Sequence, residues 1–294
     1  MLASLRDSAV RLFDLVDRAW ESDAARRASG TGLVVLFLGA LLATELARRG
    51  LLPPAIESFV PKSHFAAIGF AFTALLVLEV ISLVLALAQS VAGSVGKQFE
   101  LFSLILLREA FNELGKLGEP VEWAAASETV LHALAAGAGG LVVFAGVTLY
   151  GRLQRHLPIT SGSPEQAKFV VVKKLIAGGL LVAFVVAAGD NLARLLVGGD
   201  TYPLFSAFFT ALIFSDVLIV LVSLRYTSIY AVVFRNAGFA LATVLLRLAL
   251  VTPIYVGVAL SVGATGFVVA ITLVYNWARA DEASGEPETA NALA

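Results

Sequence analysis

The sequence predicts an all-α integral membrane protein with eight transmembrane helices, arranged as two parallel four-helix repeats and preceded by an amphipathic interfacial helix. Three observations lead to this fold class. Of the 294 residues, 59% are hydrophobic and 15% are charged, with a mean hydropathy of +0.87, whereas soluble domains carry about 25% charged residues. The apolar residues form blocks of about 18 or more, the length that crosses a hydrocarbon core. Short motifs of the first half recur in the same order in the second half.

Residues 1–29 are expected to contain an amphipathic helix that lies on the membrane surface. Leu5, Phe13 and Trp20 recur at helical spacing, and charged residues such as Arg11 and Asp14 occupy other positions. A cleavable signal peptide needs an uninterrupted apolar stretch, and here charges recur every few residues. We therefore expect this helix to remain in the mature protein.

Eight later blocks have the length and apolar character of membrane spans. The third is interrupted by Glu100, Arg108, Glu109, Asn112 and Glu113, so hydropathy alone would also permit an interfacial helix there. The predicted spans cover residues 31–49, 65–91, 97–117, 126–150, 171–195, 205–225, 230–251 and 254–277.

Loop charges predict the orientation, because short cytoplasmic loops are enriched in Lys and Arg. With eight spans, 14 of the 21 basic residues fall on the side of the N-terminus and five on the other side. The remaining two, Arg108 and Arg247, lie inside spans. Both termini are therefore predicted to be cytoplasmic.

An internal repeat supports eight crossings, because it pairs the interrupted third span with the clearly apolar seventh. Each unit then has four spans, so the two units insert in the same orientation. We expect unit one at 30–152, a cytoplasmic linker at 153–170, unit two at 171–278 and a disordered polar tail at 279–294. The matched segments are residues 46–48 with 192–194, 72–80 with 209–217, 106–108 with 245–247, and 137–143 with 263–269.

Each unit carries an acidic and a basic residue inside its spans. Glu79 and Arg108 lie at similar distances from a turn near residue 93, and Asp216 and Arg247 are related in the same way around residue 231. Antiparallel helices joined at these turns would bring each pair of charges to the same depth. One charge at the bilayer centre costs about 2.5 to 3.5 kcal/mol, which an opposite charge partly offsets. We predict two equivalent intramembrane ion pairs.

These pairs permit two interpretations. Each pair could hold a helical hairpin together, or it could belong to an ion or proton path, since ionisable groups inside membranes mark such paths. The balance of charge favours the structural interpretation, because a balanced pair is a poor proton carrier.

Glu128 and His132 form a second candidate site, one helical turn apart near the start of the fourth span. The spacing would suit a metal or a pH-sensitive pair. Two residues do not complete a coordination sphere, so a polar pair at the membrane interface is the preferred interpretation, and no metal site is predicted.

Glycines at 137, 139 and 140, and at 263 and 266, lie in the fourth and eighth spans. Small residues allow membrane helices to approach closely. We therefore expect these glycines to mark helix contacts.

Unit two resembles the phosphate-starvation-inducible PsiE family of small four-span bacterial inner-membrane proteins. The resemblance rests on residues 214–220, the basic-aromatic pair Arg225-Tyr226, Phe234-Arg235, residues 244–248 and residues 269–273, and it extends more faintly to residues 31–152. It implies an inner (plasma) membrane location and a link to stress, without a mechanism. The family has an acidic residue in its second span and an arginine in its third, which correspond to Asp216 and Arg247 and, by the repeat, to Glu79 and Arg108. Unit one has Ala88-Gln89 in place of Arg225-Tyr226, so that pair carries over only in unit two.

The composition excludes several classes of function. The formal charge of −1 and the absence of a basic, aromatic-rich stripe give no sign of nucleic-acid binding. No catalytic grouping or cofactor fingerprint is evident, so neither an enzyme nor a cofactor is expected. Two hypotheses remain: movement of an ion or small solute between the two units, or a non-transporting scaffold or stress-response component. The lipid bilayer is the expected partner, and the sequence leaves a homo-oligomer open.

The predicted orientation can be tested with single cysteines, because the chain contains none. Ser8→Cys and Ser284→Cys should react with a membrane-impermeant thiol reagent only from the cytoplasmic side. Labelling that occurs only from the outside would contradict the orientation.

Overall fold

The computed structural model describes residues 2–53, 60, 63–88, 91–154, 164–223 and 230–285, and within these ranges its regular secondary structure is entirely α-helical. The helices are α1 (Leu2–Trp20), α2 (Asp23–Arg48), α4 (Phe65–Ala86), α5 (Val91–Leu114), α6 (Trp123–Leu153), α7 (Pro164–Val197), α8 (Leu204–Ser223), α9 (Tyr230–Ala249) and α10 (Ile254–Gly285).

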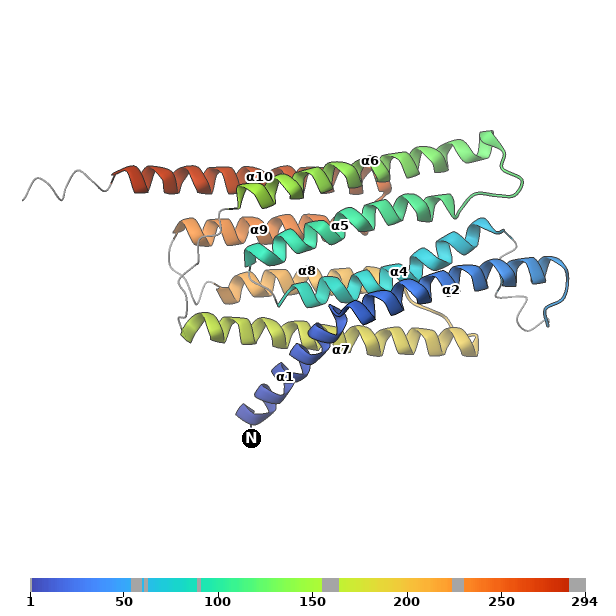
Figure 1. Ribbon diagram of the computed structural model, residues 1–294, viewed down its shortest axis with the longest axis horizontal. Helices are drawn as coiled ribbons and strands as arrows, with labels where there is room; N and C mark the ends of the chain where they lie inside the picture. Colours follow the sequence, from blue (N-terminus) through green and yellow to red (C-terminus); the bar gives the residue numbers. More distant parts are fainter. Residues whose placement is uncertain are drawn as a thin grey trace, which may run out of the picture.

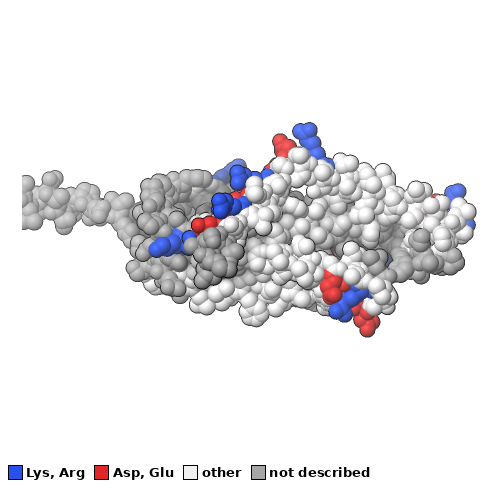
Figure 2. All heavy atoms as spheres, turned by 90° about the horizontal axis from the view of Figure 1, so that it is seen from below, with Lys and Arg blue, Asp and Glu red and all other residues white. Residues whose placement is uncertain are grey.

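Six of these helices are long and apolar enough to cross a membrane: α2, α4, α6, α7, α8 and α10. Many of their outward side chains are large and apolar, including Val186, Leu141 and Phe144. Seen from below, broad parts of the surface carry no charged side chain, and the charges gather in a few groups (Figure 2). The chain is therefore an all-α, multi-pass membrane protein.

The expectation of eight spans is met only in part. Helices form at all eight expected positions, and α5 and α9 are not among the six candidate spans found within the described residues. α5 differs from those six by its polar content, which includes Arg108, Glu109 and Glu113.

The bundle is built in layers whose helices run roughly along one direction (Figure 1). Consecutive helices pack together in each half of the chain, from α2 through α4 and α5 to α6, and from α7 through α8 and α9 to α10. α5 thus lies between α4 and α6, and α9 lies between α8 and α10. The two halves meet through α4 and α7, α5 and α9, and α6 and α10. The helices that carry Arg108 and Arg247 therefore each lie between two neighbouring helices.

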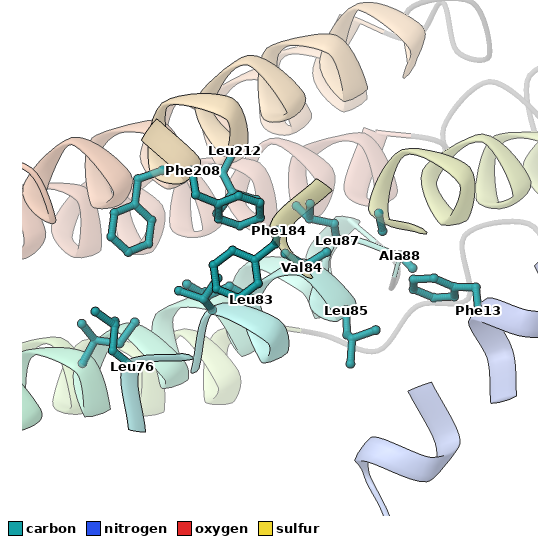
Figure 3. Packing of buried hydrophobic residues seen from close by; sticks show 14 residues of the cluster. Phe13, Leu76, Leu83, Val84, Leu85, Leu87, Ala88, Phe184, Phe208 and Leu212 are labelled. Atoms are coloured by element: carbon teal, nitrogen blue, oxygen red, sulfur yellow. The ribbon is translucent and has the colours of Figure 1, made fainter. Parts of the chain in front are cut away.

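Two apolar clusters form the core. One joins α1, α4, α7 and α8 and includes Leu83, Phe184, Phe208 and Leu212, whose side chains converge in Figure 3. The other joins α5, α6, α9 and α10 around Phe99 and Phe239. Together the clusters bury the interface between consecutive helices in both halves.

The amphipathic helix α1 packs against the bundle. Phe13 is 5% exposed and belongs to the first cluster. Asp14 pairs with Lys174 of α7 at 2.6 Å, and the Trp20 indole donates a hydrogen bond to Ser82 of α4 at 2.9 Å. Burial raises the pKa of the nearby Asp17 carboxyl above its ordinary value. The apolar side of α1 is thus partly used for protein packing, and its place on the membrane surface stays a prediction.

Several predicted boundaries move. α2 begins at Asp23, eight residues before the predicted span, because the Ser22 side chain accepts a hydrogen bond from the Ala25 N–H and caps the helix. α7 begins at Pro164, a favourable first helical residue, so part of the predicted linker is helical. α10 continues to Gly285, into the predicted disordered tail. The rest of the linker before Pro164 and of the tail lies outside the described residues, apart from Leu153 and Gln154.

The predicted glycine contacts occur on α6 but not at the two α10 positions. A Cβ on Gly140 would lie 3.1 Å from the Ser103 carbonyl oxygen and 3.3 Å from the Leu107 nitrogen, both on the α5 backbone. A Cβ on Gly263 or Gly266 would meet nothing within 4 Å. The close approach of the α5 and α6 backbones therefore depends on Gly140.

Gly140→Val should lower the thermal stability of the purified protein in detergent, because its side chain would be forced into the α5 backbone at a cost of about 1–3 kcal/mol. Gly266→Val introduces the same side chain on a helix face with free space and should change the melting temperature little. Equal losses in the two variants would contradict the close α5–α6 contact.

Candidate functional site

The structure brings the four predicted intramembrane charges together in two pairs. Glu79 Oε2 of α4 lies 3.2 Å from Arg108 Nε of α5, and Asp216 Oδ2 of α8 lies 2.8 Å from Arg247 Nε of α9. Arg247 Nη2 also donates a hydrogen bond to Asp216 Oδ1 at 3.1 Å. All four side chains are less than a tenth exposed. Each pair joins two consecutive helices, α4 with α5 and α8 with α9, as the hairpin geometry predicts.

Neighbouring polar groups extend both pairs. Arg108 Nη2 donates to Glu109 Oε2 at 3.1 Å, and Asn112 donates to the other oxygen of Glu109 at 3.2 Å. In the second pair, Arg247 Nη2 also donates to Gln98 Oε1 at 3.2 Å. The buried charges are therefore held in networks, which reduces the cost of removing them from water.

The Gln98–Arg247 contact connects the two units and reveals an offset between them. Gln98 precedes Arg108 by ten residues on α5, which corresponds to about 15 Å along the helix axis. Figure 1 accordingly shows α4 and α5 shifted along the bundle relative to α8 and α9. The expectation of two equivalent pairs is corrected here: the pairs have similar partners but lie at different levels of the bundle.

A large cavity of about 530 Å³ lies beside the first pair. Arg108, Glu109 and Glu113 of α5 contribute its charged wall, and Phe205 and Phe209 of α8 contribute an aromatic wall. The turn between α9 and α10 completes the lining. The volume lies within the usual range of ligand sites, about 300–1,000 Å³, and the walls come from both units.

A small cavity of about 50 Å³ lies beside the second pair. Lys173 of α7, Asp216 of α8 and Gln98 of α5 line it, together with Asn236 and Thr243 of α9. Such a volume holds one or two water molecules at about 30 Å³ each.

The two cavities lie at opposite ends of α8. Phe205, Ser206 and Phe209 line the large cavity, and residues from Asp216 to Ser223 line the small one. Between them Leu212 is fully buried, and it packs in the cluster that includes Ile105 (Figure 3). An apolar layer therefore separates the two cavities.

Neither Glu128 nor His132 lines the two cavities, but His132 contacts Glu113 in the wall of the large one. His132 Nδ1 lies 3.5 Å from Glu113 Oε2 on α5, and its ring packs edge-on against Tyr255. Glu128 is exposed, so the structure gives His132 a different carboxylate from the one predicted. Arg225 and Tyr226 lie outside the described residues.

Sequence reasoning missed Lys173, Gln98 and Glu113 as members of the sites. Lys173 lies near the start of the predicted fifth span and counts there only as a cytoplasmic basic residue, yet its spacing to Ala177 and Phe184, which are also buried, places all three on one helical face. The described residues contain no group of three or more His, Asp or Glu side chains that could hold a metal ion.

Comparison with known proteins gives no relative: no protein-family model, curated protein or solved structure matches the chain.

The second ion pair can be tested with a double-mutant cycle. Arg247→Leu should destabilise the protein by about 3–5 kcal/mol, because Asp216 loses its buried partner, and adding Asp216→Leu should recover much of the loss. Thermal unfolding in detergent measures all four members of the cycle. Additive effects of the two single changes would contradict the contact.

The exposed pair Asp190 and Arg194 on α7, separated by 2.8 Å, provides the matched control. The same substitutions there should cost about 1 kcal/mol or less, because water solvates each charge after its partner is lost.

Proposed function

We propose that this chain is a PsiE-like protein of the inner (plasma) membrane that moves an ion or small solute along the interface between its two units. The observation that carries the proposal is the pair of cavities at opposite ends of α8, each lined by a member of one ion pair and separated by an apolar layer. Solute sites in transporters typically lie near mid-membrane between repeats.

Eight crossings and two parallel repeats are part of this proposal. The positions of α5 and α9 support it, because Arg108 and Arg247 are buried against neighbouring helices while outward positions such as Leu104 on α5 and Leu241 on α9 are apolar. The exposed charges of α5, Lys97 and Glu100, lie near its start. The order of helix contacts and the location of the ion pairs are the same in both halves. The distribution of basic residues then puts both termini in the cytoplasm.

The proposed movement is a shift of one unit relative to the other. The units meet through three helix pairs, and the Gln98–Arg247 hydrogen bond joins them inside the bundle. Because the large cavity is wide enough for a solute and the small cavity is wide enough only for water, the described arrangement corresponds to a state loaded from the large-cavity side. Displacement of α5 against α8 and α9 would open the layer around Leu212 and Ile105.

The alternative is a scaffold or stress-response component that transports nothing. Its support is the pairing of both intramembrane arginines with carboxylates, which is sufficient to hold the helices together.

Flux through proteoliposomes, measured over a panel of ions and pH values, distinguishes the two functions. The double variant Glu79→Gln with Asp216→Asn should reduce flux about tenfold or more, since each change weakens a charged contact worth about 1.5–3 kcal/mol. The control Asp190→Asn alters an exposed carboxylate far from both cavities and should retain flux. Absence of flux in the wild-type protein across the whole panel would contradict transport and favour the scaffold.

A further inference from the structure

Arg235 of α9 is a half-buried arginine that no described carboxylate balances. Arg108 and Arg247 each pair with an acidic side chain, whereas no carboxylate oxygen of the described residues lies within 4.0 Å of an Arg235 nitrogen. Arg235 Nε is buried and has no hydrogen-bond partner in the described part of the chain, and Nη2 donates a long bond of 3.5 Å to Asn236 Oδ1. The charge of Arg235 is therefore left for another group to balance.

The surroundings of Arg235 place it near the level of the lipid headgroups. Its Cζ lies 4.5 Å from the centroid of the Tyr275 ring on α10, in a cation–π contact. α6 ends against the same part of α10, where Asn276 Nδ2 donates to the Leu153 carbonyl oxygen at 2.8 Å. Trp277, the last residue of the apolar segment of α10, is 69% exposed. Tyr and Trp are enriched where membrane spans meet the headgroups, so the guanidinium lies close to that boundary.

Basic side chains outnumber acidic ones at this end of the bundle. α5 begins here, since a Cβ on Gly96 would lie 3.4 Å from the ring of Tyr150, near the end of α6. In the neighbouring ends of α5, α6, α9 and α10, the described side chains include one carboxylate, Glu100, which pairs with Lys97 at 3.8 Å. The described cations at these ends are Lys97, Arg152 and Arg235. This end therefore carries excess positive charge.

We infer that Arg235 binds the headgroup of an anionic phospholipid. A lipid phosphate accepts charge-assisted hydrogen bonds from a guanidinium, and the stacking on Tyr275 fixes the plane of the donor group. Lys97 and Arg152 add attraction at longer range. Basic groups among membrane helices on the cytoplasmic side are typical of such lipid sites. The site does not depend on transport, and only its assignment to the cytoplasmic leaflet rests on the proposed orientation.

Thermal unfolding of the purified full-length protein in an uncharged detergent tests the site. Dioleoylphosphatidylglycerol should raise the melting temperature relative to dioleoylphosphatidylcholine, by about 2–4 °C at ten times the dissociation constant. Inorganic phosphate at the same concentration should not reproduce the shift, because it lacks the acyl chains that hold a lipid against the bundle. Equal effects of the two lipids, or an equal shift with inorganic phosphate, would overturn the inference.

Two arginines that stack on tyrosines provide matched variants. Arg235→Gln should abolish the difference between the two lipids. Arg194→Gln should retain it, because Arg194, which lies 5.9 Å from the centroid of the Tyr202 ring, is already paired with Asp190 at 2.8 Å. If both variants keep the difference, the lipid binds elsewhere and the inference is wrong.

A second measurement covers the case in which Arg235→Gln does not fold. Phosphatidylglycerol with a photoreactive headgroup, in vesicles that contain the wild-type protein, should crosslink to α9 near Arg235 or to α10 near Tyr275. Crosslinks confined to other helices would overturn the assignment.

Discussion

The cost of placing a charge in hydrocarbon decides which helices lie inside this bundle. Arg108 and Arg247 would each cost several kcal/mol if they faced lipid, so the helices that carry them occupy inner layers, where Glu79 and Asp216 pair with them. The same constraint explains how α5, which carries more charged residues than the candidate spans tolerate, runs alongside helices that are apolar enough to cross a membrane.

The offset between the units turns two similar hairpins into two different sites. Because Gln98, and not a residue near Arg108, meets Arg247, the ion pairs lie at different levels of the bundle. The first faces a cavity of ligand size with a carboxylate-rich wall, and the second faces a cavity of water size with a buried lysine. A symmetrical arrangement would give two equal sites, whereas the offset leaves an apolar layer between them. In the proposed transport, alternating access requires an apolar layer of this kind between the two sites.

Local features were predictable from the sequence, and long-range packing was not. The eight helix positions follow from apolar block length, and the pairing of Glu79 with Arg108 follows from their equal distances from one turn. The offset depends on how side chains of two distant segments interlock, and no local pattern specifies this. His132 pairs with Glu113 instead of Glu128 for the same reason: its partner comes from another helix. The burial of Lys173 was not predicted, because it depends on how α7, which begins at Pro164, packs against its neighbours.

Accessibility along α8 tests the central claim, that one helix runs from one cavity to the other through a closed apolar layer. Single cysteines at Ser206, Leu212 and Ser223 would be exposed to a membrane-impermeant thiol reagent on each side of oriented vesicles. Ser206→Cys should react from the outside, and Ser223→Cys should react from the cytoplasmic side. Leu212→Cys should react from neither side. Reaction of Ser206→Cys and Ser223→Cys from the same side, or rapid reaction of Leu212→Cys, would contradict it.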